Sequence, residues 1–330
     1  MSIPKSHRAI VITGAGGPEV LEFVTADVPA PGPGQILIRI HTAGVNRHDC
    51  NQRAAGAHHD GTAVPGLEAS GTVAAKGEGV THFQIGDPVM ALLQGGGYAQ
   101  FAVADQALVM RVPDTITLTE AAGLPEALFT AWWNFFGLLM LQPDEAAMIH
   151  GGTSGVGHLA LQALSALGYK VLATAGRMEK VEAARAFGAA AAFDYHDLDL
   201  AEQVMSATQG GGVNVLLDMS AGAHVAADIA MMAIGGRIGH LSPGHGDLHV
   251  PLRSLMAKRV KITGSLLRPL ALSEKSKIAT LIRRDVLPLV GNQVRPAIAA
   301  VFPISEAALA HAEMEKGSHI GKILLSVVEQ

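Results

Sequence analysis

A cluster of glycines between an apolar run and a helical pattern is the part of this sequence best suited to bind a charged ligand. Residues 146–150 form a short apolar run that ends at Gly151, and an apolar pattern typical of a helix follows directly. This order predicts a strand, a tight turn and a helix. Glycine lacks a Cβ atom and lets a diphosphate approach the backbone, and N–H groups at a helix start favour an anion. We therefore predict a dinucleotide site that includes the backbone of Gly152, Thr153, Ser154, Gly155 and Val156.

The glycine spacing alone is a weak signal. Gly152, Gly155 and Gly157 are spaced G-x-x-G-x-G, whereas the familiar dinucleotide motif is G-x-G-x-x-G. Gly-rich turns between a strand and a helix also occur without a ligand. The interpretation therefore depends on the segment that follows.

The end of the next predicted strand, residues 170–175, favours NADPH over NADH. A dinucleotide fold normally places an acid on the adenosine 2′-hydroxyl ~20 residues past the glycines. Here Gly176 and Arg177 stand at the strand tip, and Lys180 follows. A guanidinium and an ammonium suit a 2′-phosphate, so Gly176, Arg177 and Lys180 are assigned to the cofactor. The alternative is that these cations are solvated charges at a helix start, and Glu179 between them keeps that alternative open.

The composition is that of a chain with a large buried core. The 330 residues suggest about two domains, and 49% of them are hydrophobic while 16% are charged. A net charge of −5 provides no basic footprint for nucleic acid. No apolar run reaches the ~20 residues that cross a bilayer, and the N-terminus lacks the apolar region of a signal peptide. We expect neither a nucleic-acid partner nor a membrane.

Cysteine and histidine usage predicts no metal site. Cys50 is the one cysteine, which rules out an internal disulfide and a multi-cysteine metal lobe. The 15 histidines are scattered through different contexts, so surface or hydrogen-bonded histidine is the simpler interpretation. A reduced, cytoplasmic setting fits this pattern.

The chain has a first part rich in strands and a second part in which strands alternate with helices. The first part is rich in short strands and turns, with strands predicted at 36–40, 71–75 and 88–92. A helical segment follows at 119–141, broken near Pro125. Strands then alternate with helices, which implies a doubly wound parallel sheet; these strands are predicted at 146–150, 170–175, 190–193, 213–218, 236–241 and 260–265.

The tail returns to strand structure. An amphipathic segment at 273–286 precedes a final strand at 321–327. A closing strand after the nucleotide module suggests that the chain returns to its first domain. We predict an α/β fold whose parts are a β-rich catalytic domain at 1–127, a dinucleotide-binding domain at 128–267 and a C-terminal segment at 268–330.

Taken together, the motifs resemble the zinc-free quinone oxidoreductase branch of the medium-chain dehydrogenase/reductase superfamily, closest to the p53-inducible NADPH quinone oxidoreductase type. The resemblance covers nearly the whole chain. It rests on AGVNRHD at 43–49, PGLEASG at 65–71, GGGYA at 95–99, LPEALFTA at 124–131, HGGTSGVG at 150–157, TGSLLR at 263–268 and HIGKI at 319–323.

The resemblance implies a GroES-like domain joined to a Rossmann domain, with the active site in the cleft between them. Zinc-dependent relatives place a cysteine and a histidine where this chain has Asn46 and Leu67. Neither residue is a normal zinc ligand, so catalytic zinc is not expected.

Three residues are candidates for the reaction. Asn46 can donate an amide N–H to a substrate oxygen or beside the nicotinamide; alternatively it only caps its loop. Thr130 can bond the nicotinamide carboxamide, or instead its own helix backbone. Close relatives carry a tyrosine downstream of Asn46, whereas residues 53–60 hold none, and His58 is the nearest candidate to hydrogen-bond or protonate an oxygen.

The resemblance also implies further cofactor contacts. Tyr195 matches a tyrosine at the 2′-phosphate, although it can equally pack on Phe193. Lys322 lies in a motif that often reaches the cofactor or the cleft, although a solvated lysine is the alternative. The loops after the later strands are expected to lie beside the ribose and the nicotinamide, with core packing as the alternative for the leucines; they supply Ser220, Leu241, Ser242, Ser265, Leu266 and Leu267.

These features predict an NADPH-dependent quinone oxidoreductase that transfers a hydride to a quinone. A reductase of conjugated double bonds in enones uses the same cofactor geometry and is the alternative enzyme. A non-catalytic NADPH-binding protein is the alternative of another class. Residues 260–264 alternate like an edge strand, which favours a homodimer.

Overall fold

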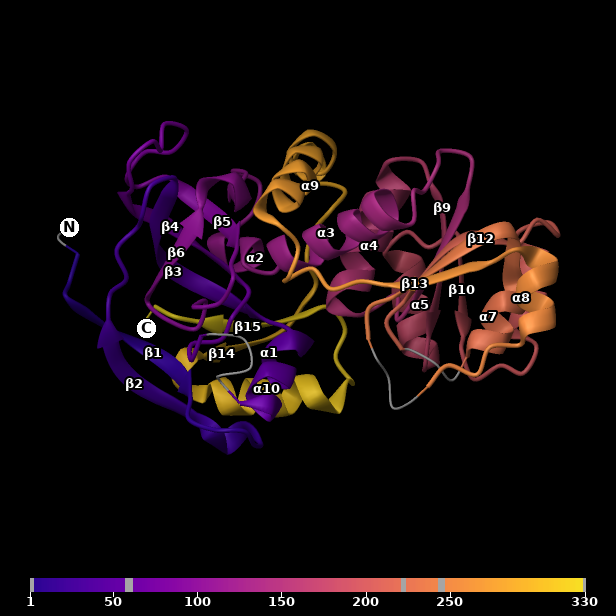
Figure 1. Cartoon of the computed structure of the whole chain (residues 1–330), viewed down its shortest axis with the longest axis horizontal. Coiled ribbons are helices and arrows are strands. Elements are labelled where there is room, and N and C mark those ends of the chain that lie inside the picture. The colour runs from indigo at the N-terminus through magenta and orange to yellow at the C-terminus, as the bar shows by residue number, and fades with distance from the viewer. Residues whose placement is uncertain (1–2, 57–61, 221–223, 243–246, 329–330) are drawn as a thin grey trace. The chain divides into compact units, whose positions relative to one another are not determined.

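The computed structural model describes residues 3–56, 62–220, 224–242 and 247–328 (Figure 1). The candidate His58 lies outside these residues. Contacts divide the chain into two compact units. The first unit comprises residues 1–126, 275–279 and 290–330, and the second comprises 127–274 and 280–289. The three-part division predicted from the sequence stays a prediction.

A seven-stranded sheet forms the centre of the first unit. Its strand order is β14-β15-β3-β4-β5-β7, and β6 also pairs with β3. All pairings are antiparallel except the parallel pair β14 and β15. The strands are β3 (Gln35–Val45), β4 (Glu68–Lys76), β5 (Pro88–Leu92), β6 (Phe101–Asp105), β7 (Val109–Arg111), β14 (Ile298–Pro303) and β15 (Lys322–Ser326). The C-terminal strand β15 therefore pairs with β3, as the expected return of the chain requires.

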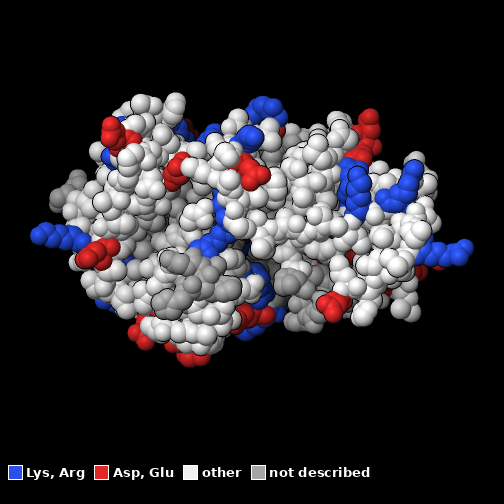
Figure 2. Space-filling view, viewed as in Figure 1, with Lys and Arg blue, Asp and Glu red and all other residues white. Residues whose placement is uncertain are grey.

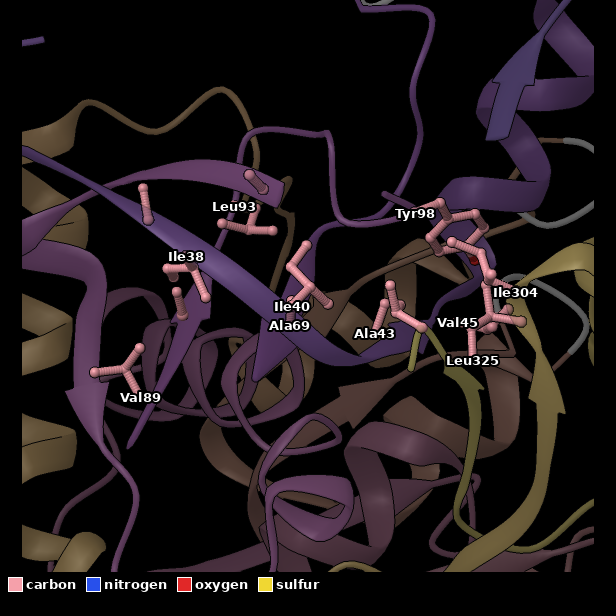
Figure 3. Close-up of a cluster of buried hydrophobic side chains, with 14 of the residues drawn as sticks. Ile38, Ile40, Ala43, Val45, Ala69, Val89, Leu93, Tyr98, Ile304 and Leu325 are labelled. Atoms are coloured by element: carbon pink, nitrogen blue, oxygen red, sulfur yellow. The ribbon is translucent and has the colours of Figure 1, made fainter. Parts of the chain in front are cut away.

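The first unit also contains a strand pair and helices outside this sheet. Two further strands, β1 (Ser6–Ile12) and β2 (Leu21–Asp27), form an antiparallel pair. The helices are α1 (Arg47–Ala55), α2 (Leu118–Ala121) and α10 (Ala307–Lys316), with single-turn helices at Pro18–Val20, Gln106–Leu108 and Ile304–Glu306. Figure 3 shows part of the core, a cluster that contains side chains from β3, β4, β5 and β15 as well as Tyr98 and Ile304.

A six-stranded parallel sheet forms the centre of the second unit, with the order β10-β9-β8-β11-β12-β13. The strands are β8 (Ala146–His150), β9 (Lys170–Ala175), β10 (Ala191–Asp194), β11 (Val213–Asp218), β12 (Met232–His240) and β13 (Lys261–Gly264). Counted from β8, this is the order 3-2-1-4-5-6 of a doubly wound dinucleotide-binding sheet, whose ligand binds where the order reverses. The inner strands are almost continuously apolar because both faces of such a sheet are covered.

Helices connect these strands. They are α4 (Gly155–Ala166), α5 (Met178–Ala186), α6 (Leu200–Ala207), α7 (Val225–Met231) and α8 (Leu252–Lys258). The amphipathic tail segment is α9 (Leu272–Asp285), followed by a single turn at Leu287–Leu289.

The helical segment before the sheet is broken as the proline predicts. The new helix α3 (Pro125–Trp132) begins at Pro125 itself, and it continues into a π-helical stretch, Trp133–Leu138. Proline suits a helix start because its missing N–H has no partner there in any case. The π-helical stretch was not predicted, and stretches of this kind are frequent at functional sites.

Candidate active-site and coenzyme-binding residues

The turn after β8 has glycine at positions where a side chain would be strained or would clash with its neighbours. Gly151 has a φ of 76°, a left-handed value that favours glycine. A Cβ atom on Gly152 would lie 2.6 Å from the Cβ of Ala173, and one on Gly157 would lie 2.3 Å from the carbonyl oxygen of Gly151. The turn therefore brings strand and helix into close contact, as a dinucleotide-binding turn does. Gly151 is a turn residue that the sequence interpretation did not assign.

Helix α4 presents its N-terminus directly after this turn. Ser154 caps the helix, and its Oγ accepts a hydrogen bond from the N–H of Gly157 at 3.0 Å. Gly155 and Val156 occupy the first helical positions, whose N–H groups have no partner within the helix. Thr153 is only 2% exposed, so it packs beneath the turn, whereas Ser154, Gly155 and Val156 are half-buried.

The end of β9 brings together the residues assigned to the adenosine end of the cofactor. Tyr195, just after β10, lies so close to Gly176 that a Cβ atom there would be 2.4 Å from the tyrosine Oη. The Tyr195 ring also faces the rings of His196 and His224, with centroids 4.3 and 5.6 Å away. Tyr195 packs against the same core cluster as Phe193. Packing and a cofactor contact are thus compatible roles for Tyr195.

Two cations follow at the start of α5. Arg177 is its N-cap residue and is exposed, while Lys180 is half-buried one turn on. Burial lowers the pKa of Lys180, and the positive charge of Arg177 lowers it further. Two like charges held close together are relieved by an anion between them. The expectation of an anion site at this strand end is thus consistent with the electrostatics.

The loops after β11, β12 and β13 carry the other predicted cofactor residues. Ser220 is exposed, and both its N–H and its hydroxyl donate to Oδ1 of Asp218. Leu266 is 69% exposed, so the alternative that it is a core residue is wrong. The N–H of Ser265 donates to the carbonyl of His240 at 3.1 Å. Half-buried positions are held by Leu241, Ser242, Ser265 and Leu267.

Buried hydrogen bonds link the end of β8 to the turn. His150, the last residue of β8, places Nε2 2.9 Å from Oδ1 of Asp228 and Nδ1 2.7 Å from Oγ1 of Thr174. Burial alone would lower the pKa of His150, but the hydrogen bond and charge of Asp228 raise it above its usual value. The carbonyl of Thr174 in turn accepts the N–H groups of Gly151 and Gly152. The backbone of the turn is thus linked through Thr174 to the buried His150–Asp228 pair.

In the first unit, Asn46 lies within a buried charged cluster. It follows β3, which is antiparallel to both β15 and β4, so the end of β3 meets the starts of its two neighbours. Those starts are Lys322 and Glu68. The Nζ of Lys322 lies 2.6 Å from Oε1 of Glu68 and 2.6 Å from Oδ1 of Asn46. Nδ2 of Asn46 donates to Oε1 of Glu68 at 3.0 Å.

This cluster settles two alternatives. Asn46 is the N-cap residue of α1 and shares a capping box with Asp49, but its side chain also bonds Lys322 and Glu68, so the alternative that it only caps its loop is wrong. Lys322 is 2% exposed, so the alternative of a solvated lysine is wrong. Burial alone would lower the pKa of Lys322, but the charge of Glu68, joined by Glu126 and Asp49, raises it. Lys322 therefore remains an ammonium.

A second set of buried polar groups holds the backbone of Asn46. Asp49 accepts the N–H of Asn46 at 2.8 Å, the N–H of Gly66 at 3.3 Å and the hydroxyl of Tyr98 at 3.2 Å. Tyr98 also contacts Nε2 of His311 at 3.1 Å. Burial raises the pKa of Asp49 to about 7, a shift that the Asn46 and Tyr98 hydrogen bonds oppose. Asp49 fixes the loop that carries Asn46.

Thr130 lies in α3 and is 6% exposed. Its carbonyl accepts a hydrogen bond from Nδ2 of Asn134, one turn on in the π-helical stretch. Sequence reasoning assigned no role to Asn134, Glu68, Asp49 or His150. Glu68 and Asn134 do leave a signal, because each is a polar residue within an apolar segment.

Within the described ranges, no three His, Cys, Asp or Glu side chains come together as metal ligands. At the position of a zinc ligand in zinc-dependent relatives, the amide oxygen of Asn46 already bonds the ammonium of Lys322, and Leu67 offers no donor atom. These residues do not fit zinc. None of the helices that the structure describes is both long and apolar enough to cross a membrane.

Charges of both signs are spread over the face of the molecule drawn in Figure 2. In Figure 2, Lys and Arg residues are interspersed with Asp and Glu residues, and most of that face belongs to neither class. Binding to nucleic acid uses a basic patch or stripe, and this face carries no continuous one among the described residues.

Comparisons with known proteins agree with this architecture. Residues 32–114 match the alcohol dehydrogenase GroES-like domain, and residues 155–283 match the family described as zinc-binding dehydrogenase. Quinone oxidoreductase of Rattus norvegicus is 30% identical over 328 residues, covering 97% of this chain and 98% of that protein. The quinone oxidoreductase of Homo sapiens is 27% identical with the same coverage.

Solved structures are similar as well. A mycobacterial protein complexed with NADPH has a TM-score of 0.84 at 28% identity, covering 97% of this chain and 99% of that one. A Pseudomonas syringae quinone oxidoreductase has a TM-score of 0.84 at 26% identity, also covering 97% and 99%. The chain therefore belongs to the medium-chain dehydrogenase/reductase superfamily of oxidoreductases, where its relatives include the quinone oxidoreductases.

Proposed function

We propose that this protein is an NADPH-dependent quinone oxidoreductase that works without zinc. The observation that carries the proposal is the end of β9, where Arg177 and Lys180 stand beside Gly176 and Tyr195 and no acid occupies the strand tip. An acid there would repel a 2′-phosphate, whereas these cations attract one. The quinone part rests on the relatives named quinone oxidoreductases.

The residues of the second unit fit a phosphorylated dinucleotide. Gly152 and Gly157 let the strand, the turn and helix α4 pack closely, because a Cβ atom at either would overlap its neighbours, and this packing is typical of a dinucleotide-binding turn. The first N–H groups of α4 favour negative charge at that place. Arg177 and Lys180 would hold the 2′-phosphate, with Tyr195 beside them.

In the first unit, Asn46 would supply the hydrogen bond to the acceptor. Lys322 can only donate, so the amide oxygen of Asn46 faces Lys322 and the amide nitrogen donates to Oε1 of Glu68. That orientation leaves the second N–H of Nδ2 as the donor that Asn46 can offer to a carbonyl oxygen. The ammonium on the amide oxygen polarises the group and strengthens this donor.

When bound, the reduced coenzyme supplies a hydride to an electrophilic carbon of the acceptor. The protein's residues then orient the two reactants and stabilise negative charge on the acceptor oxygen. A quinone is already a strong acceptor, so the demand on the protein is positioning rather than Lewis-acid activation.

The test combines coenzyme and acceptor. The purified protein is expected to oxidise NADPH with a simple benzoquinone, and to bind NADPH at least tenfold more tightly than NADH. Turnover of an enone of similar size but of no quinone would replace the proposal by the double-bond reductase. NADPH binding without turnover of any acceptor would favour a non-catalytic role.

The same preparation tests the cation pair. Replacing both Arg177 and Lys180 by Ala should lower the affinity for NADPH while leaving the affinity for NADH within about twofold. Replacing Lys170 and Arg284, which are both exposed, by Ala is the matched control for loss of two cations in the same unit. Equal losses for both coenzymes would overturn the assignment of the 2′-phosphate site.

A homodimer is part of this proposal. The strand β13 stands last in the sheet order, with β12 as its one neighbour among the described strands. Exposed strand edges tend to pair with another chain. Large apolar side chains are exposed close by in sequence, among them Leu252 at 65% and Met256 at 73% in α8.

A further inference from the structure

Asn134 is a fully buried amide that links two segments of the second unit. It is 0% exposed and lies in the π-helical stretch Trp133–Leu138. Its backbone carbonyl accepts the N–H of Leu139 at 2.8 Å, the wider spacing that defines this stretch. A buried polar side chain is costly unless its hydrogen bonds are satisfied, so the partners of Asn134 define its role.

The two partners of the side chain fix the orientation of the amide. Nδ2 donates to the backbone carbonyl of Thr130 at 2.8 Å. A carbonyl can only accept, so the nitrogen must lie on that side and Oδ1 on the other. Oδ1 lies 2.7 Å from Oγ of Ser265. Because Oδ1 can only accept, the hydroxyl hydrogen of Ser265 must point at Asn134.

This orientation determines what Ser265 can offer to a ligand. A hydroxyl has one hydrogen and two lone pairs. With its hydrogen committed to Asn134, the Ser265 oxygen can act only as an acceptor. Ser265 is half-buried and its N–H donates to the carbonyl of His240, so its backbone is held as well.

The place of Ser265 in the sheet points to the ligand group that it meets. It directly follows β13, the last strand on one side of the reversal in strand order, whereas β9 and its cations lie on the other side. A dinucleotide lies across this reversal, with one nucleotide over each half of the sheet. If the adenosine lies at β9, the nicotinamide lies over β11, β12 and β13. The nicotinamide carboxamide carries an NH₂ group that needs an acceptor.

We infer that Asn134 is a positioning residue that fixes the Ser265 hydroxyl as the acceptor for the carboxamide NH₂ of the coenzyme. This inference rests on the proposed function. The 3-acetylpyridine analogue of NADPH tests it, since a methyl group there replaces the NH₂. Affinities for NADPH and for the analogue are measured by titration calorimetry, so the readout does not depend on turnover.

The wild-type protein should prefer NADPH to the analogue. Ser265→Ala should weaken NADPH binding about fivefold, the value of one ordinary hydrogen bond, and change the affinity for the analogue less than twofold. Ser265→Thr keeps the hydroxyl and should retain the preference. Ser206→Ala, at an exposed position of α6, is the matched control and should change neither affinity.

Asn134→Leu tests the positioning role directly. It should reduce the preference for NADPH, and it should reduce it no further when Ser265 is already Ala. If Asn134→Leu does not fold, Ser265→Ala and Ser265→Thr still decide the role of the hydroxyl. Equal losses for both coenzymes in Ser265→Ala, or an unchanged preference in folded Asn134→Leu, would overturn the inference alone. A wild-type protein that binds no NADPH would overturn the proposed function with it.

Discussion

The ammonium of Lys322 lies 2.6 Å from a carboxylate oxygen of Glu68, and the two side chains are 2% and 0% exposed. They are the first residues of β15 and β4, which flank β3 on its two sides. Asn46, the residue after β3, lies between them and bonds both. Two buried charges of opposite sign are thus held at one end of three adjacent strands, where they orient one amide.

Removing one partner of this pair should be strongly destabilising. Lys322→Met leaves the Glu68 carboxylate buried without its counter-ion, and such losses cost about 3–5 kcal/mol. The double variant with Glu68→Gln should recover part of this loss, because no unpaired charge then remains. Urea unfolding followed by circular dichroism measures both free energies of unfolding.

Lys316→Met is the control for the loss of a lysine. Lys316 pairs with Glu313 but its side chain is 65% exposed, and an exposed pair of this kind contributes about 1 kcal/mol or less. Similar losses in Lys322→Met and Lys316→Met would contradict the interpretation of Lys322 as half of a buried ion pair.

Asp49 should make stability depend on pH. Burial raises its pKa to about 7, whereas an unfolded aspartate titrates near pH ~4. Between these values the folded state holds a proton that the unfolded state has lost. The stability of the wild type relative to Asp49→Asn should therefore fall as pH rises from about 4 to about 7, by at most about 4 kcal/mol.

Above pH ~7 the carboxylate is ionised in both states, so this difference should level off. Unfolding free energies of wild type and Asp49→Asn are compared at several pH values. Asp114→Asn, at an exposed position, should run parallel to the wild type. A constant difference between wild type and Asp49→Asn would show that Asp49 is ionised throughout.

The sequence predicts the parallel sheet well because each of its strands is short, apolar and bounded by turn residues. The predicted strands at 146–150, 170–175 and 213–218 have the limits found in the structure. The start of β12 was missed by several residues. Gly235 and Gly236 lie inside that strand, with Gly235 at a φ of 80°, and a glycine pair in sequence looks like the end of a turn.

The candidate site was less predictable, since its contacts join residues far apart in the chain. Asn46 and Lys322 were both singled out, but their contact depends on β15 returning to pair with β3. Asn134 was missed for a similar reason, because its partner Ser265 lies beyond the whole parallel sheet. Motif spacing reports local structure, whereas these hydrogen bonds are made by tertiary structure.

Lys180 should make the coenzyme preference depend on pH. Its pKa is lowered by burial and by Arg177, so it loses its charge at a lower pH than an ordinary lysine. The ratio of NADPH affinity to NADH affinity should therefore fall as pH rises above neutrality. Lys180→Arg should keep the ratio constant, because a guanidinium stays protonated.

Binding titrations between pH 7 and 10 measure the ratio of NADPH affinity to NADH affinity for the wild type and for Lys180→Arg. A wild-type ratio that does not change with pH, or one that falls equally in Lys180→Arg, would show that Lys180 does not meet the 2′-phosphate. Arg259→Lys, at the end of α8, is a control for exchange between the two cations elsewhere in the second unit.

A side chain at Gly176 should destabilise the protein while Tyr195 is present. A Cβ atom there would lie 2.4 Å from Oη and 2.6 Å from Cζ of the Tyr195 ring, so the ring must move. Gly176→Ala should cost about 1–3 kcal/mol of stability, as overpacking does, and it should weaken NADPH binding. Adding Tyr195→Ala should restore stability but not binding.

The control for this substitution is Gly14→Ala, because no atom lies within 4 Å of a Cβ built there. Thermal unfolding and NADPH titration are measured on the same samples. If Gly176→Ala matched Gly14→Ala in both, the close approach of Tyr195 to the strand end would have no energetic weight.

The exposed apolar residues of α8 should hold two copies of the chain together. Leu252 and Met256 are one turn apart on a helix with no buried residue, and residues so spaced share one face. Exposed apolar surface of this kind marks interaction sites.

Light scattering should give twice the 34.2 kDa mass of one chain for the wild type. The double variant Leu252→Glu and Met256→Glu should give a single mass, since association would bury two carboxylates. Ile85→Glu, at an equally exposed apolar residue of the first unit, is the control and should remain dimeric. A monomeric wild type would refute the dimer. A double variant that remains dimeric would show that α8 is not the interface.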